Sequence, residues 1–260
     1  MTISIIKNKW FRFAISLIFW ISLWYLLAYI IGSELFLPYP HTTTKAFISL
    51  LSENVFWKSI ANSFSTILRG ALVGILLGTL LGVISSYFPI GKAIISPLIT
   101  VVRATPVASF IILIYVIVRK LKLGLSFVSF LIVVIMVLPI VYTNLYTAFT
   151  SFDKKLSEVA TIYCFSVWKK LRVVYFPQIR PYLFAAIQNA LGFAWKAGVA
   201  AEVICGLSFT IGQSLSDAKT NLEMDQLFAW TATVILLSLL FEYLFKLIIK
   251  ATSKRRGIKA

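Results

Sequence analysis

Charged residues are scarce in this sequence, and acidic residues are the scarcest. Only 13% of its 260 residues are charged, with 9 Asp and Glu against 25 Lys and Arg, whereas 60% are hydrophobic. The mean hydropathy is +0.92. A soluble protein could not cover its surface with so few polar side chains. The composition therefore excludes the soluble classes and indicates an integral membrane protein.

Cysteine and histidine are also nearly absent. The sequence has one histidine, His41, and two cysteines, Cys164 and Cys205. No cluster of Cys, His and carboxylate residues occurs, so the sequence predicts no metal site. The two cysteines fall on opposite sides of the predicted topology, so we expect no disulfide within one subunit.

Long apolar runs predict six membrane-spanning helices in a single membrane domain, residues 1–260. A helix needs about 20 apolar residues to cross a bilayer, and backbone groups in lipid must pair internally, so runs of this length indicate an all-α protein rather than a barrel. The predicted spans cover residues 13–31, 60–87, 93–118, 123–149, 177–204 and 227–249. The first span is uncharged and lacks a small-residue cleavage site, so we expect it to remain as an anchor.

The net charge of +16 is explained by orientation rather than by a nucleic-acid partner. Basic residues gather before the first span, between the fourth and fifth spans, and after the sixth. They are Lys7, Lys9 and Arg12; Lys154, Lys155, Lys169, Lys170, Arg172 and Arg180; and Lys250, Lys254, Arg255, Arg256 and Lys259. With six spans, all three clusters lie on one side, which the positive-inside rule makes cytosolic together with both termini. A fourth basic cluster consists of Arg119, Lys120 and Lys122. The predicted topology places it on the extracytoplasmic side, which disagrees with the positive-inside rule.

Four glycines form a stripe along the second predicted span. Gly70, Gly74, Gly78 and Gly82 are each four residues apart, which leaves a groove without side chains on one helix face. In membranes such stripes favour close helix crossings. We expect packing within the subunit, with a contact between subunits as the alternative.

Polar residues mark the third and fifth spans. The third holds Pro97, Arg103 and Pro106. A proline inside a helix kinks it. An arginine in hydrocarbon costs about 2.5 to 3.5 kcal/mol on insertion scales. Arg103 should therefore line a polar pathway or pair with a carboxylate.

The fifth span carries Gln188, Asn189, Lys196 and Glu202 among many Ala and Gly residues. Small and polar residues together predict a buried helix that lines a pathway. Lys196 and Glu202 are six residues apart, about 240° around a helix, so each is expected to meet a partner on another span or on a second subunit. The alternative is that they fix helix packing without touching a solute.

The polar segment 153–176 separates the fourth and fifth spans. Asp153 is a candidate N-cap for a short helix that follows it. Three basic residues, Lys169, Lys170 and Arg172, favour a second solvated helix, and Pro177 suits the first turn of the fifth span. Two short helices with a bend between them would form a knob outside the membrane.

This segment resembles the cytosolic EAA loop of binding-protein-dependent ABC importer permeases. The residues that carry the resemblance are Glu158, Val159, Ala160, Cys164, Phe165, Ser166, Phe176 and Pro177. In that family a separate ATPase subunit binds the loop. The resemblance therefore implies an ATPase-coupling role for Glu158, Val159, Ala160, Cys164, Ser166 and Pro177.

Four positions depart from the family pattern. Val159 and Phe165 replace Ala, Cys164 replaces the Gly of the bend, and Phe176 replaces Leu. If the bend requires positive φ, Cys164 costs about 1 to 2 kcal/mol there.

The fifth span resembles the nitrate, sulfonate and taurine branch of the family in the stretch from Ala194 to Ile204. The resemblance implies a type I permease-like core with an extra N-terminal span, used as a homodimer in the bacterial cytoplasmic membrane. It implies an extracytoplasmic binding protein and a separate ATPase subunit that holds ATP and Mg. The solute pathway would include Arg103, Asn189, Lys196 and Glu202. Its solute would be small and often anionic, although related systems carry thiamine-type pyrimidine precursors.

No Gly-x-x-x-x-Gly-Lys-Ser/Thr sequence occurs, so we expect no cofactor on this chain and no ATP hydrolysis by it. Two alternatives stay open. One is a transporter driven by an ion gradient, with Lys196, Glu202 and Arg103 as a charge relay. The other is a lipid-modifying enzyme that uses Glu158 and Glu242, but Glu242 already has Lys246 as a favourable helical partner.

Overall fold

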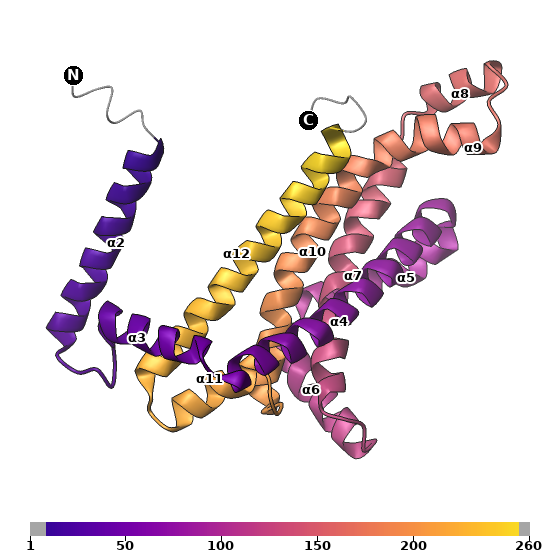
Figure 1. Ribbon diagram of the computed structural model, residues 1–260. Coiled ribbons are helices and arrows are strands. Elements are labelled where there is room, and N and C mark those ends of the chain that lie inside the picture. The colour runs from indigo at the N-terminus through magenta and orange to yellow at the C-terminus, as the bar shows by residue number, and fades with distance from the viewer. Residues whose placement is uncertain (1–8, 255–260) are drawn as a thin grey trace, which may run out of the picture.

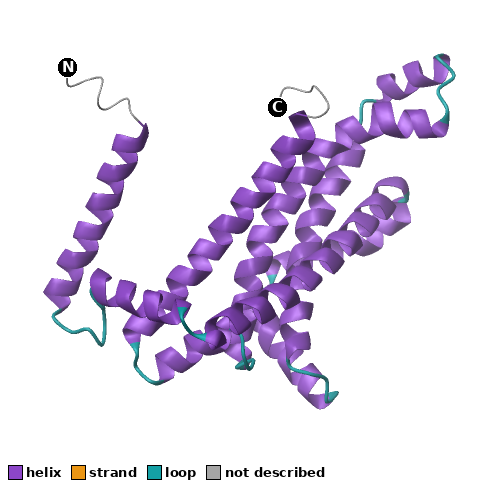
Figure 2. Ribbon diagram, in the orientation of Figure 1, coloured by secondary structure: helices purple, strands orange, loops and turns teal. Residues whose placement is uncertain are grey.

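The computed structural model describes residues 9–254, and this part of the chain is almost entirely helical (Figure 1, Figure 2). The helices are α2 (Lys9–Ile31), α3 (Pro40–Leu51), α4 (Asn54–Tyr87), α5 (Pro89–Ala104), α6 (Val107–Lys120), α7 (Ser126–Thr150), α8 (Lys154–Ile162), α9 (Val167–Lys170), the π-helical turn η1 (Leu171–Tyr175), α10 (Phe176–Cys205), α11 (Ile211–Thr220) and α12 (Met224–Lys254). Four basic residues used in the charge argument, Lys7, Arg255, Arg256 and Lys259, lie outside the described residues.

The core of the bundle is α7, which packs along both α4 and α10. Val133, Val137 and Val141 of α7 are completely buried. α10 packs along α7, and its buried Ala186, Ala190 and Ala194 belong to the same core cluster as these valines. α12 completes the bundle against α3, α10 and α11.

The glycine stripe of α4 faces α7. A Cβ at Gly78 would lie 2.8 Å from the Leu138 carbonyl oxygen and 2.8 Å from the Val141 Cβ. The other glycines of the stripe meet the next residues along the same helix: Gly70 faces Val133, Gly74 faces Val137 and Gly82 faces Leu145. The stripe therefore forms a contact within the subunit, where the two backbones come too close for any side chain.

The third predicted span is not one straight helix. α5 ends at Ala104 and α6 begins at Val107, and the two are bent by 105°. Pro106 causes the break, because a proline excludes the residue before it from helical backbone angles, and Thr105 has φ −82° and ψ 132°. The predicted third span, residues 93–118, therefore falls on two helices, α5 and α6, and the expected proline kink is a full break between them.

Among the described residues, α2, α4, α7 and α12 are long and apolar enough to cross a membrane, and the bent pair α5–α6 adds a fifth span if it counts as one. α10 matches the fifth predicted span in position but is not in this set. It carries Arg180, Lys196 and Glu202 within its length.

α2, the predicted extra span, stands apart from the bundle (Figure 1). Its connection to the rest of the described chain lies at one end, where the Trp24 indole donates a hydrogen bond to the Pro38 carbonyl oxygen (3.0 Å) and its ring stacks on Phe228. Most of its large apolar side chains are exposed. The rest of the described chain leaves most of this helix uncovered.

The two ends of the bundle differ. α8 and α9 project at the end where α2 begins and α12 finishes, whereas α3, α11 and the end of α6 lie at the opposite end (Figure 1). The basic residues of the 153–176 segment are thus at the same end as the described parts of both terminal helices. Arg119 and Lys120, in the last turn of α6, are at the other end.

Candidate functional site

The segment 153–176 forms a compact knob of two capped helices. The Asp153 carboxylate accepts a hydrogen bond from the Lys155 amide (2.9 Å) at the start of α8, which confirms the predicted N-cap. The Ser166 hydroxyl accepts from the Lys169 amide (3.4 Å) at the start of α9. Each cap pairs an amide that would otherwise lack an intrahelical partner.

The bend between the two helices does use positive φ. Cys164 has φ +50°. The Cys164 amide donates to the Thr161 carbonyl oxygen and the Phe165 amide donates to that of Ala160, both at 2.9 Å. This pair of bonds is the Schellman arrangement that ends many helices, usually with glycine at the left-handed position. The backbone keeps the glycine-like bend although Cys164 raises its cost by about 1 to 2 kcal/mol.

The residues of the EAA-like stretch face different ways. Ala160 is only 2% exposed and lies inside the knob, whereas Glu158 and Val159 are exposed on α8. Glu158 also lines a cleft of about 460 Å³ between α8 and the ends of α4 and α7, next to Tyr87 and Phe149. Ala160 therefore shapes the knob, while Glu158 and Val159 belong to its surface.

The knob exposes several large apolar side chains. Trp168 is 82% exposed. The other large apolar side chains exposed on α8, α9 and the bend are Leu156, Val159, Ile162, Tyr163 and Val167. Exposed apolar patches of this kind mark contact sites for proteins or membranes.

The knob is attached firmly to α10. Its second helix continues through η1 into α10 without a break, and Pro177 lies in the first turn of α10. At the entry to the knob, the Asp153 amide donates to the Gln178 side-chain oxygen (3.1 Å), and the rings of Phe152 and Tyr175 stack with centroids 4.6 Å apart. A movement of the knob would therefore be transmitted to α10.

The predicted pathway residues fall into two groups. Asn189 and Lys196 are exposed and lie seven residues apart on one face of α10, and neither makes a hydrogen bond or ion pair with a described residue. Arg103 is also exposed, in the last turn of α5, beside the break before α6. These three side chains remain available to a solute or to a second subunit.

Glu202 is different, because its side chain is completely buried. Its Oε2 accepts hydrogen bonds from the Ser63 hydroxyl (2.7 Å) and from the Gly212 amide (3.2 Å). Ser63 Oγ in turn accepts from the Ile211 amide (3.0 Å). Glu202 thus joins α10 to α4 and to the first turn of α11, and it does not meet Lys196.

Glycines make this junction possible. Gly206 ends α10 at φ +61°, which turns the chain back toward α4. A Cβ at Gly212 would overlap the Cβ of Glu202, so the start of α11 can approach α10 only because residue 212 has no side chain. The sequence pattern did not show this junction, since its partners are far apart along the chain.

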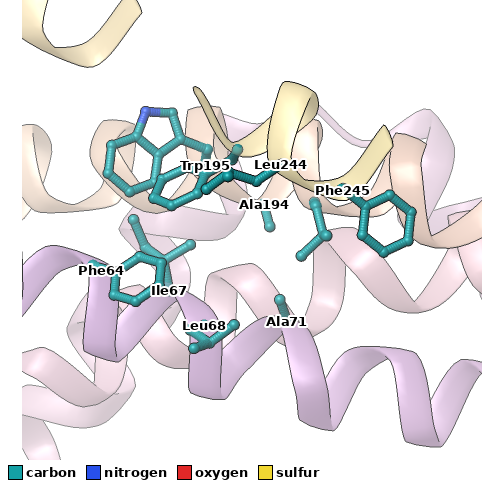
Figure 3. Close-up of a pocket in the computed structure, with 10 residues that line it drawn as sticks. Phe64, Ile67, Leu68, Ala71, Ala194, Trp195, Leu244 and Phe245 are labelled. Carbon is teal, nitrogen blue, oxygen red and sulfur yellow. The ribbon is translucent and has the colours of Figure 1, made fainter. Parts of the chain in front are cut away.

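The structure also contains an apolar cavity of about 170 Å³ between α4, α10 and α12 (Figure 3). The residues that line it are all apolar: Phe64, Ile67, Leu68, Ala71, Leu191, Ala194, Trp195, Phe241, Leu244 and Phe245. A polar solute would lose its hydration here without gaining a hydrogen bond. This cavity is therefore not a site for a small polar solute.

The sequence matches a known family. Residues 74–254 match the model of the binding-protein-dependent transport system inner membrane component family. The chain belongs to this family. Its members are transport permeases rather than enzymes, and ATP is used by a separate ATPase subunit. As a member of a family of inner membrane components with several long apolar helices, the chain is a multi-pass membrane protein.

Individual relatives support the same assignment. The chain is 32% identical over 89 residues to a putative aliphatic sulfonates transport permease protein, SsuC, of Bacillus subtilis (strain 168). That match covers 34% of this chain and 32% of the relative, so the chain matches only about a third of the relative's length.

Two solved structures, both described as inward-facing conformations of the MetNI methionine ABC transporter, have a similar fold. A CY5 SeMet soak crystal form gives a TM-score of 0.57 with 16% identity, over 75% of this chain and 93% of that chain. A native crystal form gives a TM-score of 0.57 with 18% identity, over 78% of this chain and 96% of that chain. The predicted fold class, an all-α type I importer permease, is confirmed.

Proposed function

We propose that two copies of this permease form the pathway of an importer for a small anionic solute of the sulfonate class. In this proposal a binding protein delivers the solute at the α3 and α11 end, and an ATPase subunit docks at the knob. The observation that carries the proposal is the knob itself, which is capped at both helices and continuous with α10.

The ATPase docking surface is proposed to be formed by the exposed apolar side chains of α8 and α9, among which Trp168 is the most exposed. Burying these side chains in a partner cleft would be favourable by roughly 25 cal/mol per Å² of apolar area. When ATP closes the two ATPase subunits, the knobs would be drawn together and the α10 helices would follow. That rigid-body change would switch the pathway between its inward and outward states.

The pathway is proposed to lie along the exposed face of α10. Asn189 and Lys196 are exposed there and lack partners among the described residues. A lysine left facing lipid would be costly, so a second copy or a water-filled passage is expected beside it. The exposed Arg103 at the break of α5 would extend the same passage.

Three observations favour an anion of the sulfonate class. The curated relative is described as transporting aliphatic sulfonates. The fifth span resembles the nitrate, sulfonate and taurine branch in its Ala194–Ile204 stretch. The candidate pathway carries the cations Lys196 and Arg103 on exposed surfaces, whereas the carboxylate of Glu202 is buried in the junction.

The proposed orientation places the knob and both termini in the cytosol of a bacterial cell. The cluster Lys169, Lys170 and Arg172 lies at the knob end, in agreement with the positive-inside rule. α3 and α11 would then face the extracytoplasmic binding protein.

Purification from the native membrane in mild detergent tests this proposal. We expect an ATPase subunit to copurify in equal amount with the chain, and to be lost when Trp168 is changed to Ser. After reconstitution with the binding protein, uptake of radiolabelled taurine or ethanesulfonate should require ATP on the knob side. A chain that purifies alone and transports under an ion gradient without ATP would establish the secondary-transporter alternative instead.

A further inference from the structure

A polar cleft of about 450 Å³ opens near the end of the bundle opposite the knob. Its walls come from α4, the start of α7 and the loop between α10 and α11. The lining residues are Asn62, Ser65, Thr66, Arg69, Leu125, Ser126, Leu207, Ser208 and Thr210. None of them is acidic.

Arg69 is the only charged residue in the lining, and most of its hydrogen-bonding capacity is unused. Its Nε donates to the Ser65 carbonyl oxygen (3.0 Å), which holds the side chain along α4. Among the described residues its terminal nitrogens have no hydrogen-bond acceptor, and the guanidinium has no carboxylate partner. A second cation stands nearby, since Lys58 Nζ lies 4.0 Å from the centre of the Phe209 ring in the loop wall.

The loop wall of the cleft is fixed in place. Asn62 Nδ2 donates to the Phe209 carbonyl oxygen (3.0 Å), and the Phe209 amide donates to the Gln213 side-chain oxygen (2.6 Å). The Thr210 hydroxyl donates to the Leu207 carbonyl oxygen (2.6 Å). A loop held at so many points presents a preformed surface, which lowers the cost of ordering a binding site.

Serine hydroxyl groups line the same cleft as Arg69. Those of Ser65, Ser126 and Ser208 make no hydrogen bond to a described residue. Arg69 lies nine residues inside the predicted span that starts at residue 60, where an arginine needs water, protein or a ligand around it. The site thus offers a planar, two-pronged cation and several neutral donors, with no competing carboxylate.

We propose that this cleft binds the oxyanion group of the transported solute, with Arg69 as the anchoring residue and the three serines as additional donors. A guanidinium donates two parallel hydrogen bonds to two oxygens of a sulfonate or another tetrahedral oxyanion. The proposal rests on the proposed function, because it requires that the solute arrive at this end of the molecule. In this proposal the incoming solute would reach the oxyanion site first and the α10 face with Asn189 and Lys196 afterwards.

Direct binding to the whole transporter tests the site. The complex with its ATPase is placed in nanodiscs of phosphatidylcholine, and binding of ³⁵S-labelled ethanesulfonate is measured by equilibrium dialysis. We expect Arg69→Gln to weaken binding roughly ten- to a hundredfold, as for loss of a charged hydrogen bond, and Arg69→Lys to restore part of it. The matched control is Arg119→Gln, which removes the same charge from the α6 terminus outside the cleft and should leave binding unchanged.

Ser208→Leu provides a second test that leaves α4 intact. It narrows the cleft from the opposite wall, on an exposed loop, and should also weaken binding several-fold. Unchanged binding in Arg69→Gln and Ser208→Leu, or equal weakening by Arg69→Gln and Arg119→Gln, would overturn the proposal. ATP-dependent uptake by the wild type is measured separately. Uptake without an effect of the cleft variants on binding would overturn only the binding site, whereas absence of ATP-dependent uptake would overturn the importer assignment.

A phospholipid headgroup carries the same oxyanion chemistry, and a lipid arm of the experiment distinguishes this source. Binding is repeated in nanodiscs with about one third phosphatidylglycerol, and bound lipid is counted by native mass spectrometry. The solute site predicts unchanged ethanesulfonate binding. Displacement of the label, together with phosphatidylglycerol retained by the wild type and lost from Arg69→Gln, would reassign the cleft to lipid.

Discussion

At the residue scale, the Glu202 side chain shows how much one buried carboxylate organises. It accepts two hydrogen bonds at Oε2, from Ser63 of α4 and from Gly212 of α11, while Oε1 has no hydrogen-bond partner in the described structure. Without it, two donors at the meeting point of three helices would be left unpaired. Glu202 is therefore a positioning residue for α11.

The comparison of Glu202→Gln with Glu202→Ala tests this role. Glutamine has the same shape and can accept both bonds through its oxygen, but its amide nitrogen would take the place of Oε1, which has no partner. We therefore expect Glu202→Gln to lose less stability than Glu202→Ala. Alanine leaves a cavity and two buried unpaired donors, which should cost about 2 to 5 kcal/mol. Thermal unfolding of the purified chain in detergent measures the difference, and equal melting of the two variants would contradict the assigned role.

At the element scale, two helices approach more closely than any side chain would allow. A Cβ added to Gly78 would lie 2.8 Å from the Leu138 carbonyl oxygen and 2.8 Å from the Val141 Cβ. The carbonyl oxygen is part of the backbone and the Cβ is bonded directly to it, so neither atom can move away by a change of side-chain rotamer. The helix packing of α4 on α7 thus depends on the absence of side chains, in keeping with the way membrane helices associate.

We expect Gly78→Leu to separate α4 from α7 and to cost more than the 1 to 3 kcal/mol usual for overpacking. Fluorescence-detected size-exclusion chromatography should show loss of the monodisperse peak. Leu80→Ala, on the exposed side of the same helix, is the control and should elute as the wild type. A monodisperse Gly78→Leu would show that the helices can part without loss of the fold.

The knob is the second element with a testable role. Ala160 is buried under the bend, so Ala160→Leu should distort the knob, and Glu158→Gln should remove a charge from its surface. We expect both to reduce ATP-driven uptake at least about tenfold while ATP hydrolysis by the complex continues. Ala61→Leu makes the same change on an exposed part of α4 and should transport normally. Wild-type uptake by both knob variants would remove the coupling assignment.

Sequence patterns predicted the elements better than the contacts between them. Apolar runs located the long helices, and Asp153 located the start of α8, because both signals are local. The 105° bend at Pro106 exceeds what a proline kink predicts, since it depends on how α5 and α6 pack. The Glu202 junction joins residues 139 positions apart, and no local pattern carries such a contact. The polar face of α4 at Asn62, Ser65 and Arg69 was readable as a helical stripe, but its partner loop was not.

At the scale of the whole molecule, a single copy leaves polar side chains of α10 uncovered. Asn189, Phe193 and Lys196 are exposed along α10, and α2 stands away from the bundle. A bundle with these surfaces open to lipid would leave a lysine in hydrocarbon at a cost of about 2.5 to 3.5 kcal/mol. The proposed second copy, facing α10 across a wet passage, would remove that cost.

Site-directed cross-linking tests this arrangement. In a background with Cys164→Ser and Cys205→Ala, Phe193→Cys is introduced on the α10 face, and membranes are treated with a short bifunctional maleimide. We expect a dimer band, because the axis of a two-fold assembly brings the same face of both copies together. Leu236→Cys, exposed on α12, is the matched control and should remain monomeric. A dimer formed through Leu236→Cys but not through Phe193→Cys would move the subunit contact to α12 and take the pathway away from Lys196.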